Sequence, residues 1–377
     1  MSTKHLNKSK ADKADEYYTL YEDIASEMEF HKHHFKDKIV YCNCDDPFRS
    51  NFFMYFVRNF DTLGLKRLVA THYGGSPTGR QRSLFTRTGA DSEAYKAVIN
   101  ELPSDMESTD TGINQLLKSS GNSLTKLKGS GDFKSGECLK LLNECDIVVT
   151  NPPFSLFRDF VEVLCNRNKK FLILGGTQAI SYTNIFPRLM SGEMNLGLGF
   201  RQGGLTFQLP EHYDPTIYAR FRGEDGKVYQ KVTVRWYTNL EVDRYSDYVV
   251  PAKKYSPEEY LKLDNYDAIE ITRTADIPCD YDGVMGVPIT SVGNIDPHEF
   301  EMIGITGADS SLHLITRLYG KVKQFDADGS FMGYASLDGN AVLRVKDKPD
   351  KPYCQLHGES DYLLMRFHRV FIRRRRS

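Results

Sequence analysis

The sequence predicts an α/β protein, in which helices cover a parallel sheet and a β-rich region follows. The apolar, β-branched run at Lys38–Cys44 predicts a buried strand, and the Phe-rich segment at Ser50–Asp61 has helical spacing. A second short apolar run follows at Lys66–Thr71. This strand–helix–strand order is typical of parallel strands. Beyond about Gly192 the sequence pattern changes, and short β-like runs alternate with Gly, Asp and Pro.

The other elements follow in order along the chain. Residues 1–14 are expected to form a flexible, basic lead, and residues 74–123, which are polar and rich in Gly, Ser and Thr, a long loop. Residues 15–200 are then the core that carries this loop. Residues 201–377 hold the end of the sheet, a β-rich region and an Arg-rich C-terminus. The expected helices lie at Tyr18–Phe30, Glu137–Leu142 and Ser155–Cys165, and the further strands at Asp146–Thr150, Lys170–Leu174, Val228–Tyr237, Ala268–Thr272 and Ala341–Val345.

Composition excludes several classes of protein. The chain has 377 residues, which suggests one large or two modest domains. No apolar run approaches the roughly 18 residues that cross a bilayer, and Met1–Lys13 lacks the apolar core of a secretory signal. Seven cysteines without framework spacing fit a reducing compartment, so we expect a cytoplasmic protein. A formal net charge of −1 gives no global sign of nucleic-acid binding, so any such surface must be local.

The most specific signal is the tetrapeptide Asn151-Pro152-Pro153-Phe154, directly after the predicted strand Asp146–Thr150. Asn151 precedes a proline and is pushed toward extended geometry, and the two prolines have a fixed φ. The stiff turn offers two acceptors, the Asn151 side-chain oxygen and the Pro152 carbonyl, while Phe154 adds a flat apolar face. Such a turn suits an exocyclic amine on a planar base, because gripping both amine hydrogens localises the nitrogen lone pair for attack on a methyl group. The alternative is a turn without chemistry. The strand before it and the helix after it favour a ligand site, because open α/β sheets bind ligands at strand carboxyl ends.

With these residues in view, the chain resembles S-adenosylmethionine-dependent amino-methyltransferases, in particular the EcoRI-type adenine-specific DNA methyltransferases. The resemblance includes Asp15–Thr19, Lys38–Phe53, Gly131–Phe133, Asn151–Phe154 and Tyr281–Ile289, besides the Arg-rich end. It implies a Rossmann-like S-adenosylmethionine-dependent methyltransferase sheet with a β-rich target-recognition region. It also implies methylation of adenine N6 in duplex DNA at a short defined sequence, with the base flipped out of the helix. Restriction-modification is one setting for that activity.

The resemblance assigns roles to individual residues. The catalytic set is Asn151, Pro152, Pro153 and Phe154. The cofactor-binding set is Tyr17, Tyr18, Thr19, Asn43, Asp45, Asp46, Pro47, Ser50, Asn51, Asp132 and Phe133. Two features depart from the family pattern: the turn after the first strand, Asp45–Asn51, has no glycine, and no acid ends the second strand at Ala70–Tyr73. We expect the start of the Phe-rich helix to offer backbone N–H groups in place of the glycine turn.

Arginines are the candidates for DNA contact. The first group lies in the long loop and the second ends the chain, where no acid follows Asp361. The alternatives are a merely solvated loop and a solubilising tail. The candidates are Arg80, Arg82, Arg87, Arg373, Arg374, Arg375 and Arg376.

Two other functions stay open at this point. One is a methyltransferase acting on an RNA base or a protein glutamine amide, since those enzymes share the Asn-Pro-Pro-aromatic turn. The other is a DNA-binding relative without activity, which the missing glycines would allow. No cysteine or histidine group has metal-ligand spacing, so we expect no metal site, and a monomer is compatible with the sequence.

Overall fold

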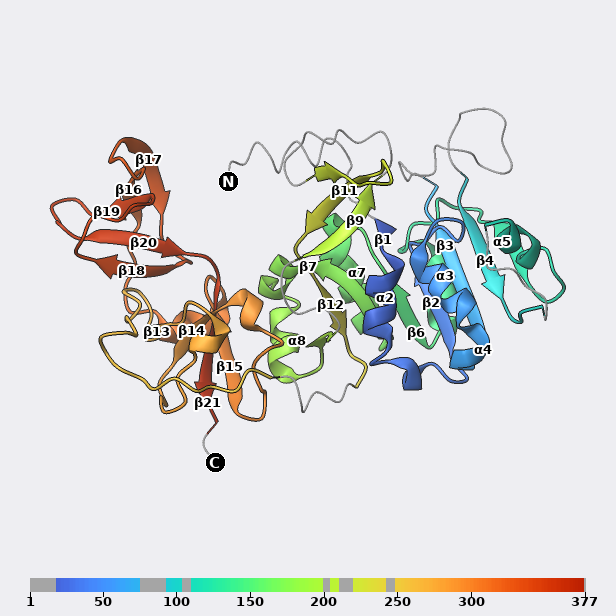
Figure 1. The fold of residues 1–377 in the computed structure, drawn as a ribbon, viewed down its shortest axis with the longest axis horizontal. Helices are drawn as coiled ribbons and strands as arrows, with labels where there is room; N and C mark the ends of the chain where they lie inside the picture. The colour runs from blue at the N-terminus through green and yellow to red at the C-terminus, as the bar shows by residue number, and fades with distance from the viewer. Residues whose placement is uncertain are drawn as a thin grey trace. The chain divides into compact units, whose positions relative to one another are not determined.

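The computed structural model describes residues 18–74, 93–103, 110–198, 204–209, 220–241 and 248–375 (Figure 1). The chain divides into two compact units. The first comprises Met1–Ala179 and Met194–Asp243, and the second Ile180–Glu193 and Arg244–Ser377. No helix among the described residues is long and apolar enough to cross a membrane.

The first unit contains an eight-stranded sheet with the order β5-β4-β3-β2-β6-β7-β12-β8. Its four central strands, β3, β2, β6 and β7, are parallel neighbours. The strands are β2 Ile39–Asn43, β3 Arg67–His72, β4 Tyr95–Ile99, β5 Ser123–Lys126, β6 Ile147–Thr150, β7 Lys170–Gly176, β8 Asn195–Leu196 and β12 Val234–Thr238. The helices of this unit are α2 Tyr21–Met28, α3 Asn51–Arg58, α4 Phe60–Leu63, α5 Asp110–Leu116, α6 Gly136–Glu144 and α7 Phe157–Asn166.

Helices cover both faces of this sheet. Successive residues of a strand point to opposite faces. In β12, Trp236 packs edge-on against Phe52 of α3 with ring centroids 5.8 Å apart, whereas Tyr237 packs against Phe157 of α7 at 5.0 Å. Helices α3 and α7 therefore lie on opposite faces (Figure 1). The apolar residues of α3 enter the same core as Val40 of β2, so the Phe-rich segment is helical because one of its faces is buried on the sheet.

The strand order creates a switch point beside β2. The chain passes from β2 through α3 to β3 on one side, and later enters the sheet again at β6 on the other side of β2. In open α/β sheets, ligands bind outside the carboxyl ends of the strands at this kind of position. The turn after β2 and the turn after β6 meet this condition.

The expected loop at residues 74–123 is partly wrong. Within its described residues, β4 pairs antiparallel with β3 and with β5, and α5 lies in the same range. Strand β4 reads YKAVI, in which only Ala97 and Ile99 are buried, so its own apolar pattern is weak. Pairing with the buried strand β3 is what makes this segment a strand.

A second, smaller sheet of the first unit has the order β1-β9-β11-β10. Its strands are β1 Tyr18–Thr19, β9 Leu205–Leu209, β10 Arg220–Arg222 and β11 Val228–Val232. In the β1–β9 pair Thr19 lies opposite Phe207. This pairing joins the beginning of the described chain to a segment almost two hundred residues later, and it brings both segments to the core of the large sheet, which includes Phe207.

The second unit is β-rich, as the sequence predicts, and its two sheets have the orders β13-β14-β21-β15 and β17-β16-β19-β20-β18. Its elements are α8 Phe186–Ser191, β13 Ile269–Glu270, β14 Met285–Pro288, β15 Phe300–Ile305, β16 Lys321–Phe325, β17 Phe331–Ser336, β18 Ala341–Val345, β19 Tyr353–Gln355, β20 Tyr362–Arg366 and β21 Arg369–Arg374.

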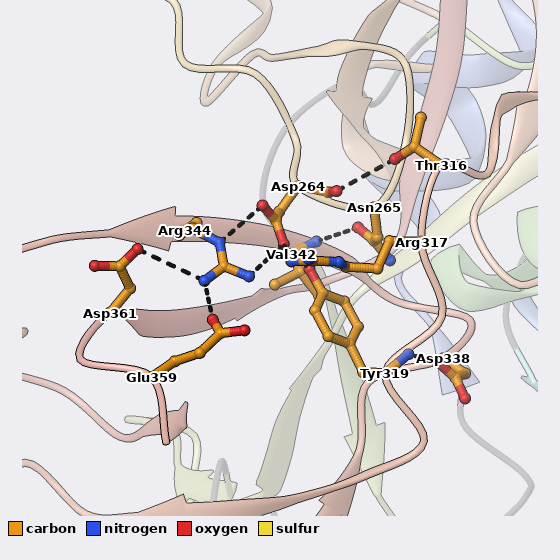
Figure 2. Close-up of polar contacts among 10 residues, drawn as sticks. All are labelled: Asp264, Asn265, Thr316, Arg317, Tyr319, Asp338, Val342, Arg344, Glu359 and Asp361. Atoms are coloured by element: carbon orange, nitrogen blue, oxygen red, sulfur yellow. Dashed lines mark hydrogen bonds and ion pairs between the residues drawn. The ribbon is translucent and has the colours of Figure 1, made fainter. Parts of the chain in front are cut away.

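A polar cluster around Asp264 holds the five-stranded sheet in place within this unit (Figure 2). The Arg344 guanidinium of β18 donates to both Asp264 carboxylate oxygens at 2.9 and 3.1 Å, and the Tyr319 hydroxyl donates to the same carboxylate. Burial opposes ionisation of Asp264, but these hydrogen bonds outweigh it and hold its pKa below the usual value. The adjacent Asn265 accepts from the Val342 N–H at 2.9 Å, which ties the same loop to β18 a second time.

The Arg-rich end is a strand, β21, and its arginines have acidic partners. Arg373 donates to Glu301 at 2.6 Å, and Arg374 donates to Glu299. Arg375 donates to a backbone carbonyl. No acid follows Asp361 in the sequence, but the pairing of β21 with β15 brings Glu299 and Glu301 to these arginines.

Candidate active site

The turn after β2 and the turn after β6 are joined by one buried carboxylate, that of Asp45. Its Oδ1 accepts a hydrogen bond from the Ser50 hydroxyl at 2.5 Å, and its Oδ2 accepts one from the Thr150 hydroxyl at 2.5 Å. Asp45 is only 6% exposed. Burial raises the pKa of Asp45 from 3.8 to about 6, the hydrogen bonds from Ser50 and Thr150 oppose this rise, and the neighbouring Asp46 carboxylate adds to it.

Ser50 also begins helix α3. It is the N-cap residue, and its hydroxyl oxygen accepts from the N–H groups of Phe52 and Phe53 at 3.1 and 3.4 Å. The next residue, Asn51, donates its side-chain amide to the Thr19 carbonyl at 2.7 Å. The polar residues of the turn thus fasten the start of α3 to β1, and Asn51 and Thr19 of the predicted cofactor set lie together.

Cys44 takes the conformation that a glycine usually supplies. Its φ is +112°, in the left-handed half of the backbone map, and its N–H donates to the Thr71 carbonyl at 3.4 Å. Side chains rarely adopt this conformation, and positions that hold it cluster at functional sites. The sharp exit from β2 is therefore made without a glycine in the Asp45–Asn51 turn.

The other two turn residues of the predicted set serve the same corner. Asp46 accepts from the Phe48 N–H at 3.0 Å and from the Tyr95 hydroxyl of β4 at 2.7 Å, and Pro47 is buried. The Tyr95 ring also lies 5.0 Å from that of His72 at the end of β3. These aromatic and polar groups occupy the end of β3, the position where the sequence has no acid.

Two buried polar atoms near these strand ends have no hydrogen-bond partner among the described residues. They are the side-chain nitrogen of Asn43, the last residue of β2, and the hydroxyl of Thr19. The Asn43 side-chain oxygen is already bound by Thr71, at 3.3 Å. Buried polar atoms are almost always hydrogen-bonded, so both atoms are suited to a polar ligand.

The Asn151–Phe154 turn follows β6 as predicted. Asn151 is partly exposed and Pro152 is buried. Phe154, the first residue of a short 3-10 helix, packs edge-on against Phe207 of β9 with ring centroids 6.3 Å apart. Because Phe207 is also paired with Thr19, the aromatic end of the turn lies beside the β1 segment of the predicted cofactor set.

The Gly131–Phe133 segment reaches the same edge of the sheet, at the end of β3. The Gly74 N–H donates to the Ser130 carbonyl at 2.8 Å, and a Cβ on Gly131 would lie 2.3 Å from the His72 carbonyl oxygen. Asp132 is partly exposed and accepts from the N–H of Lys134 at 2.7 Å, as in a turn. Phe133 points elsewhere: it is buried against Phe160 of α7, with ring centroids 5.0 Å apart.

Comparisons with known proteins identify the family of this chain. A family model described as adenine-specific methyltransferase EcoRI matches residues 5–375. The chain belongs to this family of adenine-specific methyltransferases. It is 40% identical over 321 residues to Type II methyltransferase M.EcoRI of Escherichia coli, which covers 83% of this chain and 93% of that protein. It is 37% identical over 305 residues to Type II methyltransferase M.MpnI of Mycoplasma pneumoniae, covering 79% and 85%. A third relative, M.MgeORF184P of Mycoplasma genitalium, is 33% identical over 306 residues. No solved structure gives a significant match.

In this methyltransferase some residues of the site were not predicted from the sequence. Some predicted residues lie outside the part of the chain that the structure describes. Thr150, Tyr95 and Phe207 contact predicted site residues. Only Thr150 has a signal in the sequence, because it directly precedes the Asn151–Phe154 tetrapeptide predicted to be catalytic. The predictions outside the described residues are Tyr17, the side chain of Tyr18, Arg80, Arg82, Arg87 and Arg376.

Proposed function

We propose that this methyltransferase transfers a methyl group from S-adenosylmethionine to N6 of an adenine that is flipped out of a specific duplex DNA sequence. The observation that carries the proposal is the pairing of two turns at the switch point of the sheet. The turn after β6 holds Asn151–Phe154, and Asp45 joins it to the polar turn after β2. The family adds the target base, because its description is adenine-specific.

Residues of the Asn151–Phe154 turn bind and orient the base. The Asn151 side-chain oxygen and the Pro152 carbonyl accept from the two N6 hydrogens, which draws the nitrogen lone pair out of conjugation with the ring. Phe154 stacks on the base, a contact worth about 1–3 kcal/mol in single-strand binding. Because these groups sit on a stiff turn, they are oriented before the base arrives, and this preorganisation lowers the barrier.

S-adenosylmethionine supplies the electrophilic methyl group when it is bound. The residues that fit it are Thr19, Asn43, Ser50, Asn51 and Asp132. The buried Thr19 hydroxyl and Asn43 amide nitrogen support this fit, since each lacks a partner among the described residues. The N-terminus of α3 also presents N–H groups, which suit the carboxylate of the amino-acid part of the cofactor.

The second unit is proposed to recognise the DNA. Its edge strand β17 exposes Phe331 and Tyr334, which are 55% and 66% exposed. Tyr334 lies opposite Lys323 in the β16–β17 pair, so an aromatic and a basic side chain share one face. Aromatic rings and lysines together suit nucleic acid. The relatives named Type II methyltransferases favour a restriction-modification setting. With DNA as its substrate, we expect the enzyme in the cytoplasm of a bacterial or phage-infected cell.

The test measures transfer of labelled methyl groups to unmethylated duplex DNA, with nucleoside analysis of the product. The wild type is expected to form N6-methyladenine, and Asn151→Ala to lose about 100-fold or more in kcat. Ser155→Ala is the matched control, because Ser155 is exposed in the short 3-10 helix Phe154–Leu156 that follows the turn, and it belongs to no proposed contact. Transfer to RNA or to protein but not to DNA would mean that the proposed substrate is wrong. No transfer, together with no calorimetric binding of S-adenosylmethionine, would favour an inactive DNA-binding relative.

Phosphate contacts by the terminal arginines are tested separately. The sequence predicts contacts from Arg373, Arg374 and Arg375, although Arg373 and Arg374 are ion-paired in the structure. Each lost phosphate contact is expected to reduce the slope of log affinity against log salt by about 0.9. An unchanged slope in the triple alanine variant would show that these arginines serve the fold alone.

A further inference from the structure

We propose that Asp45 is a positioning residue for methyl transfer, which holds the base-gripping turn and the cofactor-facing turn in one fixed arrangement. The inference rests on the proposed function, because it gives Asp45 a task within that reaction. It differs from the sequence prediction, in which Asp45 binds the cofactor itself.

The first argument is the identity of the two hydroxyl donors. Thr150 directly precedes Asn151, so a bond to its hydroxyl anchors the base-gripping turn at its first residue. Ser50 is the N-cap of α3, so a bond to its hydroxyl anchors the helix start proposed to face the cofactor. The two donors are 100 residues apart in the chain, and one carboxylate joins them. A shift of either turn would therefore be transmitted to the other.

The second argument is that Asp45 has little left to offer a ligand. Each carboxylate oxygen already accepts a hydrogen bond at 2.5 Å, and the residue is 6% exposed. By contrast, Asn43 and Thr19 have buried polar atoms with no partner among the described residues. The capacity for binding a polar ligand lies with those neighbours, and Asp45 contacts the protein.

The third argument concerns charge. A buried ionised carboxylate is costly, and it is retained where its charge or geometry has a use. A carboxylate accepts from two hydroxyl donors at once, whereas an amide has only one oxygen acceptor. The Asp46 carboxylate in the same turn raises the pKa of Asp45, and Asp45 itself adds to the raised pKa of the buried Cys42 thiol in β2. Burial dominates, so Asp45 gains a proton more readily than an exposed aspartate, and protonation removes one of its two acceptor sites.

The experiment separates kcat from KM in steady-state methyl transfer to duplex DNA. Thr150→Val is expected to lower kcat by about 10–100-fold while KM for S-adenosylmethionine changes less than about twofold, because a misplaced reacting group costs rate. Thr150→Ser restores the hydroxyl and is expected to recover most of the rate. Thr238→Val is the matched control: Thr238 is equally buried at the end of β12, but its hydroxyl donates to the Phe171 carbonyl. This control is expected to keep the wild-type kcat.

A pH profile gives the readout that a purely structural role would not move. Wild-type kcat is expected to fall as pH drops through about 6, and Asp45→Asn to lose this step while keeping a lowered kcat. If Thr150→Val turns over like the wild type, or if the Asp45→Asn profile keeps the step, the positioning role is overturned although the enzyme still methylates DNA. If the wild type does not methylate DNA, the proposed function fails first, and the two failures are distinguishable. If Thr150→Val does not fold, the kcat of Thr150→Ser and the pH profile of Asp45→Asn still test the positioning role.

Discussion

Replacing Asp45 by asparagine should change how the stability of the first unit depends on pH. The pKa of Asp45 is about 6 in the folded chain, against 3.8 for an ordinary aspartate. At about 1.36 kcal/mol per pKa unit, this difference corresponds to about 3 kcal/mol. Because the folded-state pKa is raised, the stabilisation is fully present below about pH 3.8 and is lost as pH rises through about 6.

The size of the effect in a practical range follows from the same values. Between about pH 5 and about pH 7.5 the wild type should lose about 1.4 kcal/mol of unfolding free energy through this group. Asp45→Asn has no ionisation at this position. Titration of the other carboxylates is common to both proteins and cancels in the difference. The free energy of unfolding of Asp45→Asn, minus that of the wild type, should therefore rise by about 1.4 kcal/mol between these two pH values.

The assay is urea unfolding followed by tryptophan fluorescence. Trp236 is the single tryptophan of the chain and is 1% exposed in β12, so its signal reports the unit that contains Asp45. Asp159→Asn is the control, because Asp159 belongs to the same unit and is half-exposed. Parallel stability profiles of the wild type and Asp45→Asn over this pH range would refute the reasoning, since they would mean that Asp45 has an ordinary pKa in the folded chain.

Three further changes test the packing that surrounds the site. Because φ of Cys44 is +112°, Cys44→Gly should leave the free energy of unfolding unchanged or raise it by up to about 1 kcal/mol, whereas Cys44→Val should lower it by about 1–2 kcal/mol. Equal urea midpoints for the Gly and Val variants would contradict this. Gly197→Ala should cost about 2–4 kcal/mol in the same assay, since a Cβ would lie 2.2 Å from the buried Glu27 carboxylate; a cost below about 1 kcal/mol would disprove the close contact. Arg369→Met should destabilise the second unit by about 3–5 kcal/mol, measured by thermal unfolding in circular dichroism, because it leaves Glu270 buried without its 2.6 Å partner. The reverse result, an unchanged transition, would mean that Arg366 compensates.

The elements of the central sheet and the tetrapeptide at the candidate site can be predicted from local sequence alone. The run at Lys38–Cys44 predicts β2, and DIVVT followed by Asn-Pro-Pro-Phe predicts β6 and its turn. These predictions hold because a buried parallel strand is a continuous apolar run and proline fixes its own backbone, and both are local properties. The two turns also follow from parallel topology, which brings strand carboxyl ends to one edge.

Which side chains contact one another at that edge depends on how the elements pack. Thr150 and Asp45 lie 105 residues apart, and nothing in the sequence around either residue predicts their contact. Strand β4 forms through pairing with β3, and two arginines of β21 pair with Glu299 and Glu301, which lie just before and within β15. Phe207 reaches Phe154 although no local pattern links them. Long-range hydrogen bonds, strand pairs and ring contacts depend on how the elements pack, so they leave no periodicity in the sequence from which they could be read.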